Sequence, residues 1–166
     1  MALLLTLAAC ASSPASDMGE PSVSASASGG EGCDGVTVVV DASAFEDADE
    51  ISQSQCIETD EAIAASDALD EAGVTTEGTT EYGDQVVCRV NGLPAEDAAL
   101  TAEDGSEHFE TCESMPAAFA YWGLWVKPAD GEWAYAQEGL STLQLQPGES
   151  VALLFTLNGE PAAPTA

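Results

Sequence analysis

The pattern of apolar and polar positions predicts a set of short strands with one helix among them. Residues 36–42 are almost wholly apolar and rich in β-branched side chains, which favours a buried strand. Residues 59–72 repeat apolar side chains at helical spacing, with Thr59 as the expected N-cap and Gly73 as the stop. Further strands are expected at residues 51–58, 84–90, 121–126, 132–136, 140–144 and 150–155.

The segments between these elements are polar and are expected to form loops. Residues 45–50 and 95–110 are acidic, and residues 74–83 form a polar stretch that should end in a turn. The order is two N-terminal strands, one helix and then several mostly antiparallel strands. That order predicts an α+β fold of the β-grasp type.

Aromatic residues are concentrated in residues 121–140, which hold all three tryptophans and two of the three tyrosines. Turn residues at 128–131 predict a hairpin within this segment. Because side chains alternate along a strand, Tyr121 and Trp125 should face one side and Trp122 the other. The simpler interpretation of each ring is a place in the core. The alternative is that one face of the hairpin forms a recognition surface.

The charge balance limits the kinds of partner. The chain of 166 residues has 30 acidic and 2 basic residues, a net charge of −28, which disfavours nucleic acid and anionic membrane surfaces. A solvated acidic surface that keeps an exported protein soluble accounts for this composition. The length fits one domain with extended ends.

The first residues form an apolar run that ends in Leu7-Ala8-Ala9-Cys10 and resembles a bacterial lipoprotein lipobox. The resemblance implies cleavage before this cysteine and lipidation of its thiol. A plain cleaved signal peptide is the alternative, and the run is too short to span a membrane. Because no basic residue precedes the run, we expect the translated protein to begin further upstream. The expected parts are a signal peptide (1–10), a flexible tether (11–32), a folded domain (33–158) and a tail (159–166).

The other four cysteines are even in number and would be exported with the domain into an oxidising compartment. Three pairings are possible. A hairpin of the first two strands brings Cys33 opposite Cys56, and a bridge from Cys88 to Cys112 would tie an acidic loop to its strand, so these two disulfides are expected. The loop closed by the Cys33–Cys56 bridge would contribute about 3 kcal/mol in the chain-entropy view. The cysteine spacing contains no Cys-x-x-Cys pair, which disfavours a zinc or redox site.

Residues with catalytic or metal-binding chemistry are few. The single histidine, His108, lies in an acidic segment without a neighbouring nucleophile motif and is interpreted as a loop residue. The acidic segments lack the alternating oxygen ligands of a calcium loop. The only cations, Arg89 and Lys127, are interpreted as ion-pair partners, and the alternative is that either orients an anionic ligand group. We expect no enzymatic activity, no metal and no cofactor.

A series of short motifs follows a fixed order along the chain. They are Ala72-Gly73, Tyr82-Gly83, Cys88-Arg89-Val90-Asn91-Gly92, Tyr121-Trp122, Trp133 with Tyr135, and Pro147-Gly148-Glu149-Ser150-Val151. Their order and spacing resemble the transcobalamin-like C-terminal domain. This small β-grasp module ends transcobalamin and intrinsic factor, and it occurs in bacteria as a stand-alone exported domain. The resemblance covers about residues 36–155.

The resemblance implies a function in ligand binding. In the vitamin carriers this module covers one face of cobalamin while a separate helical barrel grips the other, and these 166 residues contain no such barrel. A flat, partly apolar ligand is implied, with a corrinoid as the first candidate and an uptake transporter as a candidate partner. The ligand-binding residues that it implies are Tyr121, Trp122, Trp125, Trp133, Tyr135, Gln137 and Leu140.

We therefore expect a module that is anchored by lipid to the outside of a bacterial cell membrane and binds a small ligand. The alternative is a cell-surface module that docks onto another protein through its aromatic hairpin, since exposed aromatic patches are typical of interfaces. Fold resemblance alone is a weak guide to function, so the choice depends on the geometry of the site.

Overall fold

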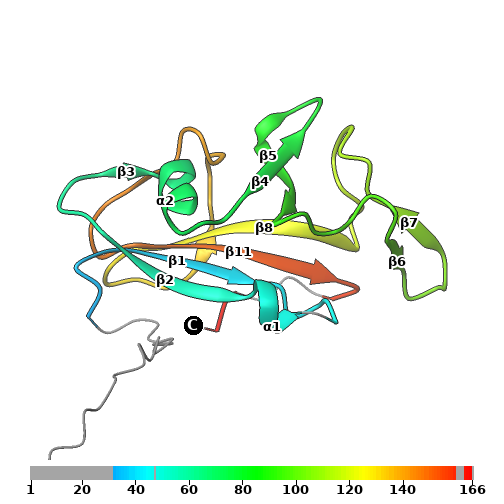
Figure 1. Ribbon diagram of the computed structural model, residues 1–166, viewed down its shortest axis with the longest axis horizontal. Coiled ribbons are helices and arrows are strands. Elements are labelled where there is room, and N and C mark those ends of the chain that lie inside the picture. The colour runs from blue at the N-terminus through cyan, green and yellow to red at the C-terminus, as the bar shows by residue number, and fades with distance from the viewer. Residues whose placement is uncertain (1–31, 47, 160–162, 166) are drawn as a thin grey trace, which may run out of the picture.

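The computed structural model describes residues 32–46, 48–159 and 163–165 (Figure 1). The expected lipidation site, Cys10, and nearly all of the expected tether lie outside these residues. Within them the chain is mostly strand with few helices, and it is built around a five-stranded sheet in the order β2-β1-β11-β8-β9. The strands of this sheet are β1 (Gly35–Asp41), β2 (Gln53–Glu58), β8 (Ala120–Lys127), β9 (Ala134–Tyr135) and β11 (Ser150–Leu157).

The first and last strands of the domain meet at the centre of this sheet, where β1 and β11 are parallel. Val38 lies opposite Val151, and Val40 lies opposite Leu153. β2 and β8 flank this pair in antiparallel orientation, and β9 extends the sheet beyond β8. Neighbouring parallel strands need a long connection, and here all the other elements belong to that connection.

The connection carries several small elements. α2 and the β4–β5 hairpin lie over one face of the sheet, and the β6–β7 hairpin stands at the end where β11 finishes (Figure 1). Asn158, just after β11, donates from Nδ2 to the Thr101 carbonyl of β6 at 2.6 Å. These elements are α1 (Ala48–Ile51), β3 (Ile63–Ala64), α2 (Ala65–Glu71), β4 (Thr76–Thr79), β5 (Gly83–Val90), β6 (Ala99–Thr101), β7 (Glu107–Phe109) and β10 (Gln144–Leu145). β3 pairs with β10, β4 with β5, and β6 with β7.

The main core lies between the sheet and the elements above it. Alternate residues of the central strands point into this core, and Val38, Leu153 and Trp122 are 0%, 0% and 6% exposed. Leu69 of α2 and Leu140 belong to the same core and are fully buried. Burial of apolar side chains is the largest favourable term in folding, so this layer supplies most of the stability of the domain.

The opposite face of the sheet carries a smaller apolar cluster of Val39, Trp125 and Ala152, against which Trp133 and Leu154 pack. The expected alternation along the hairpin is therefore confirmed, because Trp122 and Trp125 belong to different clusters on the two faces.

The helix is shorter than expected and begins later. α2 begins at Ala65, so the expected N-cap at Thr59 is wrong; the N-cap residue is Ala64, which makes no side-chain capping hydrogen bond. Thr59 Oγ1 accepts the backbone N–H two residues ahead, and the segment Ile63–Ala64 pairs with β10 instead of joining the helix. Pairing with a distant strand thus overrides the helical spacing. The stop at Gly73 is confirmed by its φ of +72°.

Three segments that we expected to be irregular contain regular elements. Most of α1 falls within residues 45–50, β4 within 74–83, and β6 and β7 within 95–110. The strand expected at 140–144 is displaced to Gln144–Leu145. The missed strands are short and largely exposed, so they lack the apolar alternation by which strands are recognised in sequence.

Both expected disulfides are present. Cys33 pairs with Cys56 and Cys88 pairs with Cys112, each with a Cα–Cα distance of 5.6 Å. Disulfides of this kind form in an oxidising, extracytoplasmic environment. Among the residues that the structure describes, no helix combines the length and the hydropathy needed to cross a bilayer.

The central position of Leu153 leads to a stability prediction. Replacing Leu153 by Ala should lower the free energy of unfolding by about 2–5 kcal/mol, because the lost methyl groups leave a cavity between the sheet and α2. The neighbouring Leu154→Ala on the opposite, less covered face should cost clearly less. Urea unfolding followed by tryptophan fluorescence measures both. Equal losses for the two variants would contradict this assignment of the main core.

Candidate functional site

A cleft lies between β5 and the outer edge of β8, with a volume of about 260 Å³. We call it the β5–β8 cleft. One wall comes from β5, and the other comes from the first half of β8 together with β9 and the residues that follow it. Its lining residues are Gln85, Val86, Val87, Tyr121, Trp122, Gly123, Leu124, Tyr135, Ala136 and Glu138.

The cleft exists because β9 is short. β9 pairs with β8 only at Trp125 and Val126, and one further bond joins the Ala136 N–H to the Leu124 carbonyl. The chain then leaves β8 and crosses to the start of β5, where the Leu140 N–H donates to the Asp84 carbonyl. Within the described part of the chain, the first half of β8 is therefore left without a neighbouring strand on this side, and that open edge forms one wall of the cleft.

Glycine makes the crossing possible. A Cβ on Gly139 would lie 2.5 Å from the Cα of Gln85, so only a residue without a side chain allows the two backbones to approach so closely. The sequence offered no signal for this contact. A glycine between Glu138 and Leu140 is compatible with many loop conformations.

Tyr121, Trp125 and Tyr135 form one aromatic group beside the cleft. The rings of Trp125 and Tyr135 stack with centroids 3.9 Å apart, and the hydroxyl oxygens of Tyr121 and Tyr135 lie 3.3 Å apart. Gly123 makes room for this stack, because a Cβ there would lie 3.0 Å from Trp125 Nε1 and 3.2 Å from Tyr135 Cε1. Partial burial, and after it the hydrogen bond with Tyr121, raises the pKa of Tyr135 above its ordinary value of 10.0.

Trp122 belongs mainly to the core. Its ring packs edge-on against Phe155 with centroids 5.2 Å apart, and it also contacts Phe45. Its Nε1 donates to the Leu93 carbonyl at 2.9 Å. Trp122 therefore meets the cleft with a ring whose position is already determined by packing and by a hydrogen bond.

The other expected ligand-binding residues do not line this cleft. Trp133 lies beside Lys127, whose Nζ is 5.9 Å from the ring centroid, in a separate hollow that residues 163–165 also line. Gln137 lines a shallow hollow next to the cleft and donates from Nε2 to the Tyr135 carbonyl. Leu140 is buried in the main core. The structure thus brings together Tyr121, Trp122 and Tyr135, with Trp125 packed against Tyr135.

Sequence reasoning missed the wall supplied by β5. Gln85, Val86 and Val87 were recognised only as parts of a strand, and Glu138 only as one of many acidic residues. Their place in the cleft depends on how the β4–β5 hairpin lies over β8, which is a tertiary contact. No local sequence pattern predicts this contact.

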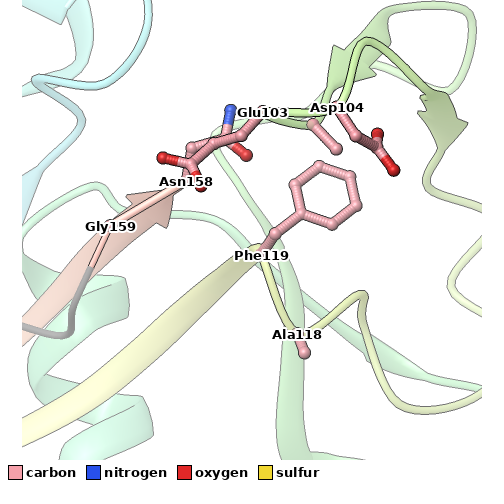
Figure 2. A pocket seen from close by; sticks show the side chains of 7 residues that line it. Glu103, Asp104, Ala118, Phe119, Asn158 and Gly159 are labelled. Atoms are coloured by element: carbon pink, nitrogen blue, oxygen red, sulfur yellow. The ribbon is translucent and has the colours of Figure 1, made fainter.

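A second hollow, of about 580 Å³, lies where the end of β11 meets the β6–β7 hairpin. Figure 2 shows the ring of Phe119 inside it, between Asn158 and the acidic side chain of Asp104. Hydrogen bonds from the hydroxyl and the N–H of Ser106 hold the pKa of the Asp104 carboxyl below its ordinary value. Asp104 is therefore already engaged by its own turn.

The two cations differ: among the described residues Arg89 forms an ion pair, whereas Lys127 lies over the Trp133 ring and forms no ion pair, so its expected ion pairing is not found. Arg89 forms an ion pair with Glu77 at 2.9 Å and donates to the Glu110 carbonyl at 2.7 Å, so its interpretation as an ion-pair residue is confirmed. His108 Nε2 lies 3.6 Å from the buried Glu110 carboxylate. Glu110 also lies near Cys88 and Cys112, but their sulfurs are joined in a disulfide and are not metal ligands.

Comparison of the chain with models of known protein families, with curated proteins and with solved structures finds no match.

The Tyr121–Tyr135 pair predicts an alkaline titration. Because Tyr135 has a raised pKa in the folded protein, its protonated form adds stability that is present below pH 10.0 and is lost as the pH rises through the folded value. Replacing Tyr135 by Phe should remove the most alkaline step of tyrosinate absorbance, and Tyr121→Phe should move that step towards lower pH. A spectrophotometric titration of the folded protein tests both, and an unchanged curve for Tyr135→Phe would contradict the assignment.

Proposed function

We propose that the protein is a non-catalytic binding module that acts outside the cytoplasm and takes its ligand in the β5–β8 cleft. The observation that supports this most is the convergence of Tyr121, Trp122 and Tyr135, three residues expected from sequence to bind a ligand, on one cleft. Ligand sites typically combine apolar walls with a few polar groups that orient the ligand. Here the tyrosine hydroxyls and Glu138 are the polar groups.

The fold proposed for this module is the β-grasp of transcobalamin-like domains. Three features support it: the central parallel pair β1–β11, the N-terminal hairpin β1–β2, and the helix α2 over one face of the sheet. The proposal rests on this arrangement and on the order of the sequence motifs.

The first ligand to test is a corrinoid, which is the choice implied by the resemblance. The cleft is open and smaller than a typical closed pocket, so it suits contact with one side of a flat ligand. A second protein, such as an uptake transporter, would then cover the other side. No cofactor or metal belongs to this proposal.

Docking onto a protein partner is the second candidate. Its support is that most aromatic residues of the hairpin are packed in the two apolar clusters, and Tyr135, at 39% exposed, is the most accessible of the expected aromatic residues. One accessible ring leaves little area for stacking a large ligand. A backbone edge beside that ring offers a different way to bind.

Calorimetric titration with cobalamin and cobinamide tests the ligand. If the cleft binds a corrinoid, Tyr135→Ala should weaken binding at least about tenfold, which corresponds to about 1.4 kcal/mol. Trp133→Ala is the matched control, because Trp133 lies in a separate hollow, and it should change affinity little. If only Trp133→Ala weakened corrinoid binding, the site would instead be the hollow beside Trp133. If neither cobalamin nor cobinamide gave a heat signal, corrinoids would be excluded as ligands.

Lipid anchoring through Cys10 is tested by fractionation of cells that produce the full chain. Cys10→Ala should move the protein from the membrane fraction into a soluble or secreted fraction, because the acyl chains supply the membrane affinity. Ser12→Ala is the matched control and should leave the protein with the membrane. Membrane association that survives Cys10→Ala would contradict the anchor.

A further inference from the structure

Among the residues that the structure describes, the outer edge of β8 has a strand partner along only half its length. On its inner side, β8 pairs with β11 from Ala120 to Lys127. On its outer side, β9 pairs only with Trp125 and Val126. The opening of the β5–β8 cleft coincides with the unpaired half, since residues 121–124 line it.

The unpaired backbone groups at this edge can be identified. The Leu124 carbonyl accepts from Ala136, so the backbone groups of Leu124 point outward. Residues two positions apart in a strand direct their backbone groups to the same side, so the N–H and C=O of Trp122 and the C=O of Ala120 also point outward. The Ala120 N–H donates to the Ala117 carbonyl, but no described backbone group pairs with Trp122 at this edge.

We propose that this edge accepts an extended, cationic segment of a partner protein as an added β-strand. The inference rests on the proposed function, namely that the β5–β8 cleft is the binding site, and it names the partner. In strand addition, main-chain hydrogen bonds supply affinity, and pockets for alternate side chains supply specificity. Tyr135 and Val87 line the cleft beside the free edge and would contact such side chains.

Charge selects the kind of segment. The chain has 30 acidic and 2 basic residues, and the cleft carries Glu138. Both basic residues lie outside it: Arg89 is paired with Glu77, and Lys127 is at the far end of β8. A segment with lysine or arginine is therefore attracted. A second copy of this chain is repelled, and the tether of residues 11–32, which has acidic but no basic residues, is disfavoured.

The strand β2 provides an internal comparison. It lies at the other edge of the sheet and, of the strands in the described ranges, pairs only with β1. Its side chains are mostly polar, half of them are exposed, and it ends at Glu58. Polar and charged residues at an edge discourage pairing with other chains. Strand addition is thus expected at β8 and not at β2.

The test uses the full chain and synthetic peptides as probes. A short peptide of alternating Val and Lys should bind, and the same peptide N-methylated at alternate residues should bind at least about tenfold more weakly, because it lacks the donors for the edge. Amide hydrogen exchange should slow at Trp122 and Leu124 and stay unchanged across β2. A peptide of alternating Val and Glu should not bind.

Two charge-reversal variants locate the site. Glu138→Lys should weaken binding of the Val/Lys peptide, whereas Glu58→Lys, which makes the same charge change on β2, should not. Equal binding of the methylated peptide, protection of β2, or a stronger effect of Glu58→Lys would overturn the inference. So would binding that appears only after the tether of residues 11–32 is removed, because the tether would then be the occupant.

The outcomes also separate this inference from the proposed function. Corrinoid binding that is weakened by Tyr135→Ala, without any binding of the Val/Lys peptide, would overturn strand addition and leave the cleft as the binding site. Absence of binding by both kinds of probe would overturn both proposals.

Discussion

β1 and β11 lie side by side at the centre of the sheet, although almost the whole domain separates them in sequence. Bringing them together costs chain entropy. That cost is offset by the burial of apolar side chains, because Val38, Val151 and Leu153 are completely buried. The strands β2 and β8 extend this central pair on either side, each antiparallel to its neighbour. The disulfides Cys33–Cys56 and Cys88–Cys112, one on either side of α2 in the sequence, stabilise the fold by restricting the conformations of the unfolded chain.

The candidate site is a consequence of how that central layer is covered. The elements that close the core from above include the β4–β5 hairpin, which brings Gln85 to the edge of β8. The chain after β9 must reach this hairpin, and it does so through the close approach of Gly139. The chain after β9 therefore separates from β8 halfway along the outer edge of β8. The same packing that completes the core thus opens the β5–β8 cleft and, among the described residues, leaves the backbone of Trp122 without a strand partner at this edge.

The aromatic residues serve packing first. Trp122 belongs to the main core, and Trp125 belongs to the smaller cluster on the other face of the sheet. Each ring is therefore held in place by packing on its own face. Tyr135 is supported from below by Trp125 and from the side by Tyr121, and it keeps part of its ring accessible. A binding residue supported in this way needs little ordering when a ligand arrives, which favours affinity.

Local features of the sequence determined much of the fold: the buried strand near Val38, the stop at Gly73, the two faces of the aromatic hairpin and both disulfides. Each follows from neighbouring residues or from cysteine number and strand order. The start of α2 at Ala65, the β6–β7 hairpin and the wall of the cleft at Gln85 were decided by the tertiary structure. Their positions depend on contacts between segments far apart in the chain. Such contacts can override local preferences, and they are not visible in the local sequence pattern.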